Sequence, residues 1–235
     1  MAGGAYAAFV MAVAWNFYYR ADKIRAYALQ ARQGFQSMGN DAAAARAQLY
    51  LAVSDYAEVK LDTARENFLR TFEQAQAAGD GWCEGWCGQM LGRLAVQGGD
   101  LAHAEHWLMH AYELRRAHHE AHNTVSDLAW LGRLCLAQAQ PAQALAHTSE
   151  AMARLGQISA QAHVWELQDV YLAHAEALSA GRADASPFIQ NAYQHLKHIA
   201  DGIADPTTRE CFCTYPTNAR IIAAWQRGYP KPFPN

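Results

Sequence analysis

The sequence of 235 residues contains only seven prolines and carries a weak formal net charge of −3, with a pI near 6.4. Few prolines leave long stretches uninterrupted, and those stretches are rich in alanine, the residue that loses least side-chain entropy in a helix. Lysine and arginine are not clustered, and phosphate binding needs such clusters. We therefore expect an all-helical protein, of one large or two small domains, that does not bind nucleic acid directly.

Long apolar runs are also absent. The run from Ala5 to Trp15 has eleven residues, whereas a membrane span needs about twenty. No basic segment precedes it, so it does not fit a signal peptide. We expect a buried helix and no membrane association. Because no capping segment precedes this apolar helix, we also expect that the chain begins inside a larger architecture, as a fragment of a longer protein would.

The five cysteines are an odd number and form no disulfide-like framework, which fits a reducing cytoplasm. Cys211 and Cys213 fall in the C-terminal tail, where an extended chain would point their thiols to opposite sides. We expect buried or half-buried thiols and a cytoplasmic protein.

Motifs that carry catalysis are missing as well. The sequence has no GxxxxGK[ST] phosphate loop, no HExxH, no GxSxG and no GxGxxG. We therefore expect no catalytic residue, no cofactor and no enzyme activity.

A histidine cluster is the most suggestive chemical feature. His103, His106 and His110 fall at i, i+3 and i+7 of one expected helix, opposite its apolar face, and His118, His119 and His122 follow beyond it. Cys83 and Cys87 lie on a neighbouring helix. A metal site needs ligands that converge on one point, and the CxxxC spacing differs from that of a zinc knuckle. We favour a solvated polar face without a metal, and keep a metal-binding protein as the weakest alternative.

What the sequence does contain is a repeat. Residues 91–100, LGRLAVQGGD, return as LGRLCLAQAQ at residues 131–140, with a small residue at Gly92 and Gly132. Forty and eighty residues before Gly92 stand Ala52 and Ala12. A second series, Ala64, Ala104 and Ala144, has the same period, with partners at +4 and +7 on one helical face. Toward the C-terminus the phase slips by one residue, and Ala173, Ala185, Ile189 and Ala192 fit a unit displaced by forty-one.

Breaks containing glycine or proline separate the periodic segments. They predict five helical hairpins, made of helices at about 5–18, 21–37, 42–57, 61–78, 83–97, 101–117, 122–138, 141–155, 160–179 and 184–200.

This pattern resembles the tetratricopeptide repeat (TPR), whose motif runs W-x2-L-G-x2-Y, then A-x3-F and a proline. Leu91-Gly92, Gly99, Ala104 and Leu108 match it well. The usual period is about 34 residues, so a period of forty implies helices longer by about one turn per hairpin. The resemblance implies a right-handed α-solenoid over residues 1–200, with a capping helix and tail over 201–235 that cover the last hairpin.

Within that family, the long alanine-rich repeats are similar to the C-terminal arrays of bacterial signalling ATPases, adenylate-cyclase-like proteins and transcriptional regulators of the maltose-activator type. That resemblance implies a regulatory part of a longer protein, with ATPase, cyclase or DNA-binding domains of the same protein as possible partners.

A binding groove is expected on the concave face, which the first helices of successive hairpins line. The position after the small residue leans outward and is occupied by Arg93, Arg133 and His174. Two arginines one repeat apart would grip a peptide carboxylate or an acidic partner by forked hydrogen bonds. Alternatively, each arginine pairs with a neighbouring glutamate. The expected groove residues are Arg93, Arg133, Trp86, Gln89, Tyr56, Ser126 and His174.

The favoured function is therefore a non-catalytic scaffold or sensor that binds a protein or peptide. The alternative is a sensor domain that closes around a small-molecule effector.

Overall fold

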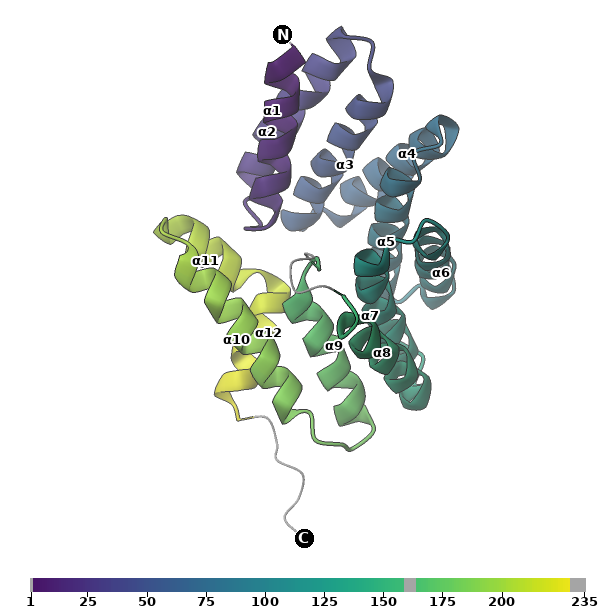
Figure 1. Ribbon diagram of the computed structural model, residues 1–235, viewed down its shortest axis with the longest axis vertical. Coiled ribbons are helices and arrows are strands. Elements are labelled where there is room, and N and C mark those ends of the chain that lie inside the picture. Colours follow the sequence, from purple (N-terminus) through teal and green to yellow (C-terminus); the bar gives the residue numbers. More distant parts are fainter. Residues whose placement is uncertain (1, 159–163, 229–235) are drawn as a thin grey trace. The chain divides into compact units, whose positions relative to one another are not determined.

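The computed structural model describes residues 2–158 and 164–228, and within these ranges it contains twelve helices and no strand (Figure 1). The all-α class expected from the alanine content and periodicity is confirmed. The chain divides into two compact units, unit 1 from Met1 to Leu94 and unit 2 from Ala95 to Asn235. No described helix is long and apolar enough to cross a membrane.

Unit 1 is built from antiparallel hairpins. Helix α1 (Ala2–Asn16) packs on α2 (Ala21–Ser37), and α3 (Asp41–Ala57) packs on α4 (Leu61–Ala78). Helix α3 also contacts α1 and α2, so the second hairpin stacks on the first. Helix α5 (Gly81–Gly98) begins in this unit and continues past its boundary.

Unit 2 repeats the scheme with α6 (Leu101–Ala117), α7 (Ala121–Ala137), α8 (Pro141–Leu155), α9 (Leu167–Ala180) and α10 (Ser186–Gly202). Helices α7 and α8 form one hairpin, α9 and α10 form the next, and α9 packs on both α7 and α8. Within each unit, a hairpin thus covers the apolar flank of its neighbour, as in a helical-repeat solenoid.

The periodic small residues lie where helices meet. Every position of the two repeat series is buried. The first helices carry Ala12, Ala52, Gly92, Gly132 and Ala173, and the second helices carry Ala64, Ala104, Ala144, Ile189 and Ala192, with Ala185 at the N-cap of α10. At Gly132 of α7, a Cβ atom would lie 2.5 Å from Cγ2 of Thr148 on α8. The close approach predicted for this glycine is therefore confirmed.

The turns between helices are as regular as the helices. A residue with positive φ recurs every twenty residues, at Tyr19, Gly39, Val59, Gly79, Gly99, His119 and Ala139. After each, the next backbone N–H returns to the preceding helix, for example Lys60 N to Asp55 O at 2.9 Å. This is the helix C-terminal motif in which a left-handed residue lets the chain reverse. Each forty-residue repeat thus consists of two segments of twenty residues, each made of one helix and one turn.

The predicted bounds of two helices need correction. The first helix is Ala2–Asn16, not 5–18, because the turn at Tyr19 comes after it. The ninth helix begins at Leu167; its predicted start at 160 lies outside the described residues.

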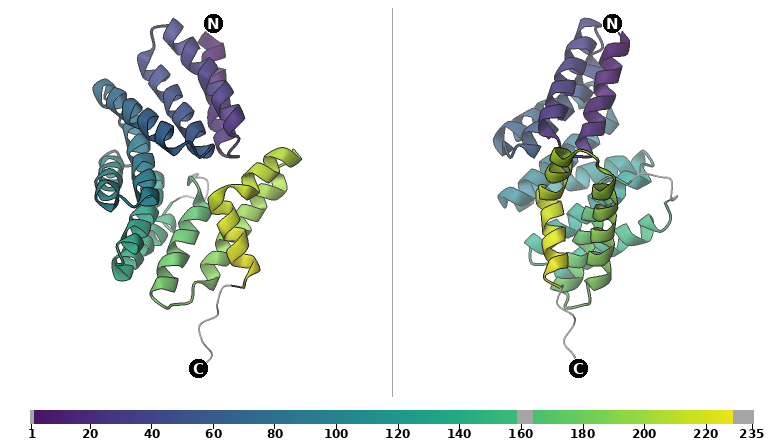
Figure 2. Two further views of the ribbon diagram at one scale, coloured as in Figure 1. Left: turned by 180° about the vertical axis from the view of Figure 1, so that it is seen from behind. Right: turned by 90° about the vertical axis from the view of Figure 1, so that its left-hand side faces the viewer.

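At the C-terminus, two short helices replace the single capping helix: α11 (Pro206–Thr214) and α12 (Pro216–Gln226). Helix α12 packs along α10 and contacts α9, so it covers the last hairpin as expected (Figure 2). Cys211 and Cys213 lie on α11 rather than in an extended stretch, and none of the five cysteines forms a disulfide.

Candidate functional site

The three residues predicted to lean outward into a groove are buried instead. The exposed fractions of Arg93, Arg133 and His174 are 3%, 8% and 6%. The expected orientation is therefore wrong, and what these side chains contact inside each unit becomes the relevant question.

Arg133 is held by two carboxylates from the next hairpin. Its Nη1 and Nη2 donate to the two carboxylate oxygens of Asp169 at 2.7 and 2.6 Å, and its Nε donates to Glu176 at 3.0 Å. The guanidinium also lies over the ring of Trp130, 4.7 Å from its centroid. Burial alone would lower the pKa of Arg133, but the charges of Asp169 and Glu176 outweigh it and raise the pKa above its ordinary value. Glu176 in turn accepts a hydrogen bond from Arg220 on α12. The alternative of an internal acidic partner is thus the one observed for Arg133.

His174 occupies the equivalent position on α9 and is also internal. Its Nδ1 lies 2.9 Å from the hydroxyl of Thr148 on α8, and its ring meets Phe188 of α10 edge to face at 4.4 Å. Burial lowers the pKa of His174 below its ordinary value. The side chain therefore ties three helices together in its neutral form.

The remaining groove residues divide between the units. Tyr56 of α3 and Trp86 of α5 are half-buried, Gln89 of α5 is buried, and all three lie in unit 1 with Arg93. Ser126 is buried on α7, in unit 2 with Arg133 and His174. The ladder of Arg93 and Arg133 draws on both units, and its role in binding stays a prediction.

The histidines of α6 lie as expected on its polar side, with His103 and His106 exposed and His110 half-buried. His103 contacts the N-cap carboxylate of Asp100 at 2.8 Å. Among the described residues, no three histidine, cysteine or acidic side chains are grouped so that they could hold a metal ion.

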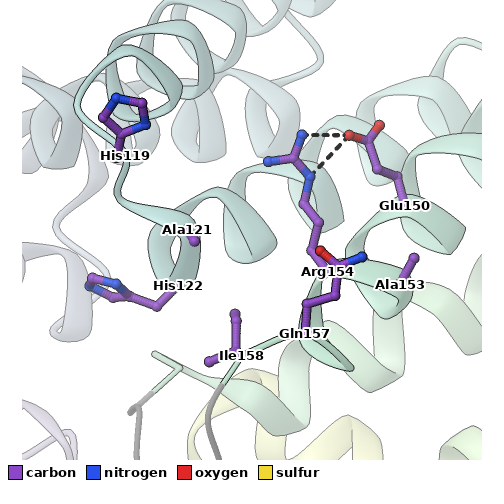
Figure 3. Close-up of a pocket in the computed structure, with 8 residues that line it drawn as sticks. All are labelled: His119, Ala121, His122, Glu150, Ala153, Arg154, Gln157 and Ile158. Atoms are coloured by element: carbon purple, nitrogen blue, oxygen red, sulfur yellow. Dashed lines mark hydrogen bonds and ion pairs between the residues drawn. The ribbon is translucent and has the colours of Figure 1, made fainter.

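The feature that sequence reasoning missed is a surface groove in unit 2. It has a volume of about 690 Å³ and lies between the start of α7 and the end of α8. Figure 3 shows the imidazoles of His119 and His122 on one side, and Arg154 and Gln157 on the other, with Ile158 at the bottom of the view. We call it the unit 2 groove. Its lining mixes polar residues with Ala121, Ala153 and Ile158 and comes from two segments about thirty residues apart, so no single motif marks it.

Arg154 is fixed in place by several neighbours. Its Nε and Nη2 donate to Glu150 at 3.0 and 2.7 Å, and Nη2 also donates to the hydroxyl of Tyr112 at 3.0 Å. A longer contact of 3.3 Å joins Nη1 to the hydroxyl of Thr124. The guanidinium is thus oriented before any ligand arrives, and His119 and His122 lie on the other side of the groove.

Comparison with known proteins supports the fold. No protein-family model matches the chain, and no curated protein matches it. Among solved structures, it resembles the apo form of RapI, with a TM-score of 0.65 and 13% identity over 96% of this chain and 65% of that chain. It also resembles BtubC (BKLC) from P. vanneervenii, with a TM-score of 0.54 and 14% identity over 98% of this chain and 94% of that chain.

The chain therefore spans somewhat less than two thirds of the length of RapI. At these low identities, the structural similarity establishes the helical-repeat fold and nothing finer. The assignment to the tetratricopeptide family rests on the sequence motif alone.

Proposed function

We propose that this protein is a non-catalytic interaction module that binds a peptide segment of a partner protein. The observation that carries the proposal is the unit 2 groove, an open depression whose lining includes an arginine held by Glu150 and Tyr112, the amide of Gln157 and two histidines. These groups can donate and accept hydrogen bonds along a peptide backbone. The small side chains of Ala121 and Ala153 leave room for the backbone to approach.

The helical-repeat fold adds support of a different kind. Within each unit, neighbouring hairpins pack on one another, so equivalent surface positions recur and can form extended binding surfaces. The proposed partner is a protein or peptide, and neither nucleic acid nor membrane.

The finer assignment depends on the sequence resemblance. We propose that the chain is the regulatory part of a larger bacterial signalling or transcription-regulatory protein and acts in the cytoplasm. What supports this is the similarity of its long, alanine-rich repeats to the arrays of such proteins.

The test is selection of a random-sequence peptide library on the immobilised full chain. Enriched peptides should bind the wild type, and binding to His122→Ala or Gln157→Ala should be about tenfold weaker, the loss of roughly one good hydrogen bond. His106→Ala, an exposed histidine of α6 outside the groove, is the matched control and should bind normally. The proposal fails if nothing is enriched, or if the groove variants bind every enriched peptide as well as the control does.

A small-molecule effector is the second candidate, because about 690 Å³ lies within the usual range for small-molecule sites, about 300 to 1,000 Å³. A metabolite that binds there should raise the melting temperature of the wild type and of His106→Ala, but not that of His122→Ala. Equal shifts in all three proteins would exclude this groove as the effector site.

A further inference from the structure

A second groove lies in unit 1, between α2, α3 and α4, with a volume of about 510 Å³. We call it the unit 1 groove. Alanines form part of its surface, and its polar lining comes from Arg32, Arg70, Asp41, Gln36, Gln48 and Gln74. All three helices belong to unit 1, so the groove is complete within it.

This groove is the repeat counterpart of the one in unit 2. Lining residues of the two grooves are eighty positions apart in sequence, which is two repeat periods. The pairs are Asp41 and Ala121, Ala42 and His122, Arg70 and Glu150, Gln74 and Arg154, Ala77 and Gln157, and Ala78 and Ile158. A depression at the start of one helix and the end of the next is therefore built by the repeat backbone, and the side chains decide its chemistry.

The two arginines of the unit 1 groove are available for a ligand. Nη1 of Arg32 donates to Oε1 of the buried Gln48 at 2.6 Å, which orients the guanidinium, and the buried Nε makes no hydrogen bond to a described residue. Arg70 is exposed and forms no ion pair or hydrogen bond with another described residue. Asp41 is the only carboxylate among the described lining residues. The lining therefore has an excess of positive charge.

The other lining groups suit an extended chain. Gln36 and Gln74 are exposed and make no side-chain hydrogen bond to a described residue, so their amides can donate to and accept from a peptide backbone. Alanines such as Ala42 and Ala77 let that backbone come close. Arginine binds carboxylates in a forked geometry, which adds direction to the charge attraction.

We propose that the unit 1 groove binds an extended segment of a partner protein that carries an aspartate or glutamate side chain, with Arg32 and Arg70 as the residues that recognise the carboxylate. This rests on the proposed function as a peptide-binding module and adds a second site with its own specificity. A basic segment is disfavoured, because two cations would face it without a compensating pair of carboxylates.

The experiment selects a random peptide library on the full chain carrying His122→Ala and Gln157→Ala, so that the unit 2 groove contributes little. Enriched peptides should share an acidic residue, and their affinity should be measured by fluorescence anisotropy. Arg70→Gln should weaken binding about tenfold, the loss of one charge-assisted hydrogen bond. Changing the acidic residue of the peptide to its amide should weaken it equally.

The matched control is Arg65→Gln, because Arg65 is an exposed arginine of the same helix that lies outside the groove. It should leave the affinity unchanged, and Asp41→Asn should strengthen binding by removing the opposing charge. Enriched peptides without acidic residues, or equal losses for Arg65→Gln and Arg70→Gln, would overturn the unit 1 site while leaving the proposed function in place. Failure of wild type and double variant alike to enrich any peptide would overturn both.

Discussion

The two grooves occupy the same repeat positions, yet the arginine that lines the unit 2 groove is paired with a carboxylate, whereas the arginines that line the unit 1 groove are not paired with the carboxylate of any described residue. In unit 2, Arg154 is already bound by Glu150 and Tyr112. In unit 1, the position of Glu150 is taken by Arg70, and that of Arg154 by Gln74, so the acid that would neutralise the groove is replaced by a cation. The repeat supplies the shape twice, and exchange of a few surface residues gives each copy a different ligand preference.

The same contrast appears in the ion pairs that join neighbouring hairpins. In unit 1, Arg25 of α2 bonds Asp55 and Glu58, each at 2.8 Å, and its side chain keeps 32% of its surface exposed. In unit 2, the side chain of Arg133 binds a similar pair of carboxylates with 8% exposed. Solvent therefore weakens the attraction between Arg25 and its carboxylates, whereas the attraction between Arg133 and its carboxylates is almost unscreened.

The largest effect is expected from removing these arginines. Arg133→Met leaves Asp169 buried without its cation and should lower the free energy of unfolding by about 3–5 kcal/mol. Arg25→Met should cost less, about 1 kcal/mol, because Glu58 is partly exposed and the buried Asp55 keeps its hydrogen bond from Asn67. Urea unfolding followed by circular dichroism measures both, and equal losses would break the contrast between the units.

The next-largest effect on stability is expected at the small residue where the first helix of a hairpin packs closely on the second. Gly132→Ala would place a methyl group 2.5 Å from Thr148, whose hydroxyl is engaged with Ala144 and His174. We expect a net loss of about 1–2 kcal/mol despite the better helix propensity of alanine. The counterpart in unit 1 already carries a methyl, so Ala52→Gly should also destabilise, by about 1 kcal/mol. Chemical denaturation of each variant checks both values. A stabilised Gly132→Ala protein would show that the two helices are not held at this distance.

A smaller, favourable effect is expected at the turns. Val59 has a φ of 61° and an exposed fraction of 69%. Its left-handed conformation is unfavourable for a β-branched residue, and its side chain gains little from burial. Val59→Gly should stabilise unit 1 by about 1 kcal/mol. In unit 2, Ala139→Gly should do the same to a smaller extent, because alanine is not β-branched. Thermal unfolding measures both, and Gly79→Ala, which makes the reverse change, should lower the melting temperature.

The smallest effect is a dependence of stability on pH. We expect it only in unit 2, from the repeat position that His174 occupies. The folded protein keeps His174 neutral because burial lowers its pKa below 6.5, whereas the unfolded chain takes up a proton near that pH. The contribution of neutral His174 to stability is therefore complete above pH 6.5 and is lost as the pH falls toward the lower pKa of the folded state. The counterpart in unit 1 is Val53, which has no proton to bind. His174→Gln should flatten the decline in stability on acidification, while the exposed His106→Gln should leave it as in the wild type.

Much of the fold follows from sequence, because small residues recur wherever two helices touch. Ala12, Ala52, Gly92 and Gly132 mark these contacts at a constant spacing, and the structure buries all four. The turns were harder to foresee in detail. Among the seven turns spaced by twenty residues, only three have a glycine at the left-handed position, Gly39, Gly79 and Gly99, and the others carry ordinary side chains there.

The binding surface was predicted less well, for a physical reason. Arg133 was placed on an open face because its partners, Asp169 and Glu176, come from the following hairpin, at a distance in sequence that no local pattern reveals. The grooves escaped notice because their counterpart residues differ in type, for example Arg70 and Glu150. Periodicity in apolar residues predicts where helices pack, and it carries no information about which surface positions face a ligand.

Hydrogen–deuterium exchange of the full chain, with and without a library-selected peptide, tests the central claim most directly. Binding should slow exchange in residues 119–122 and 150–158 of the unit 2 groove, or in residues 32–48 and 70–78 of the unit 1 groove when the peptide is acidic. Protection confined to α10, α11 and α12, with both grooves unchanged, would contradict the account.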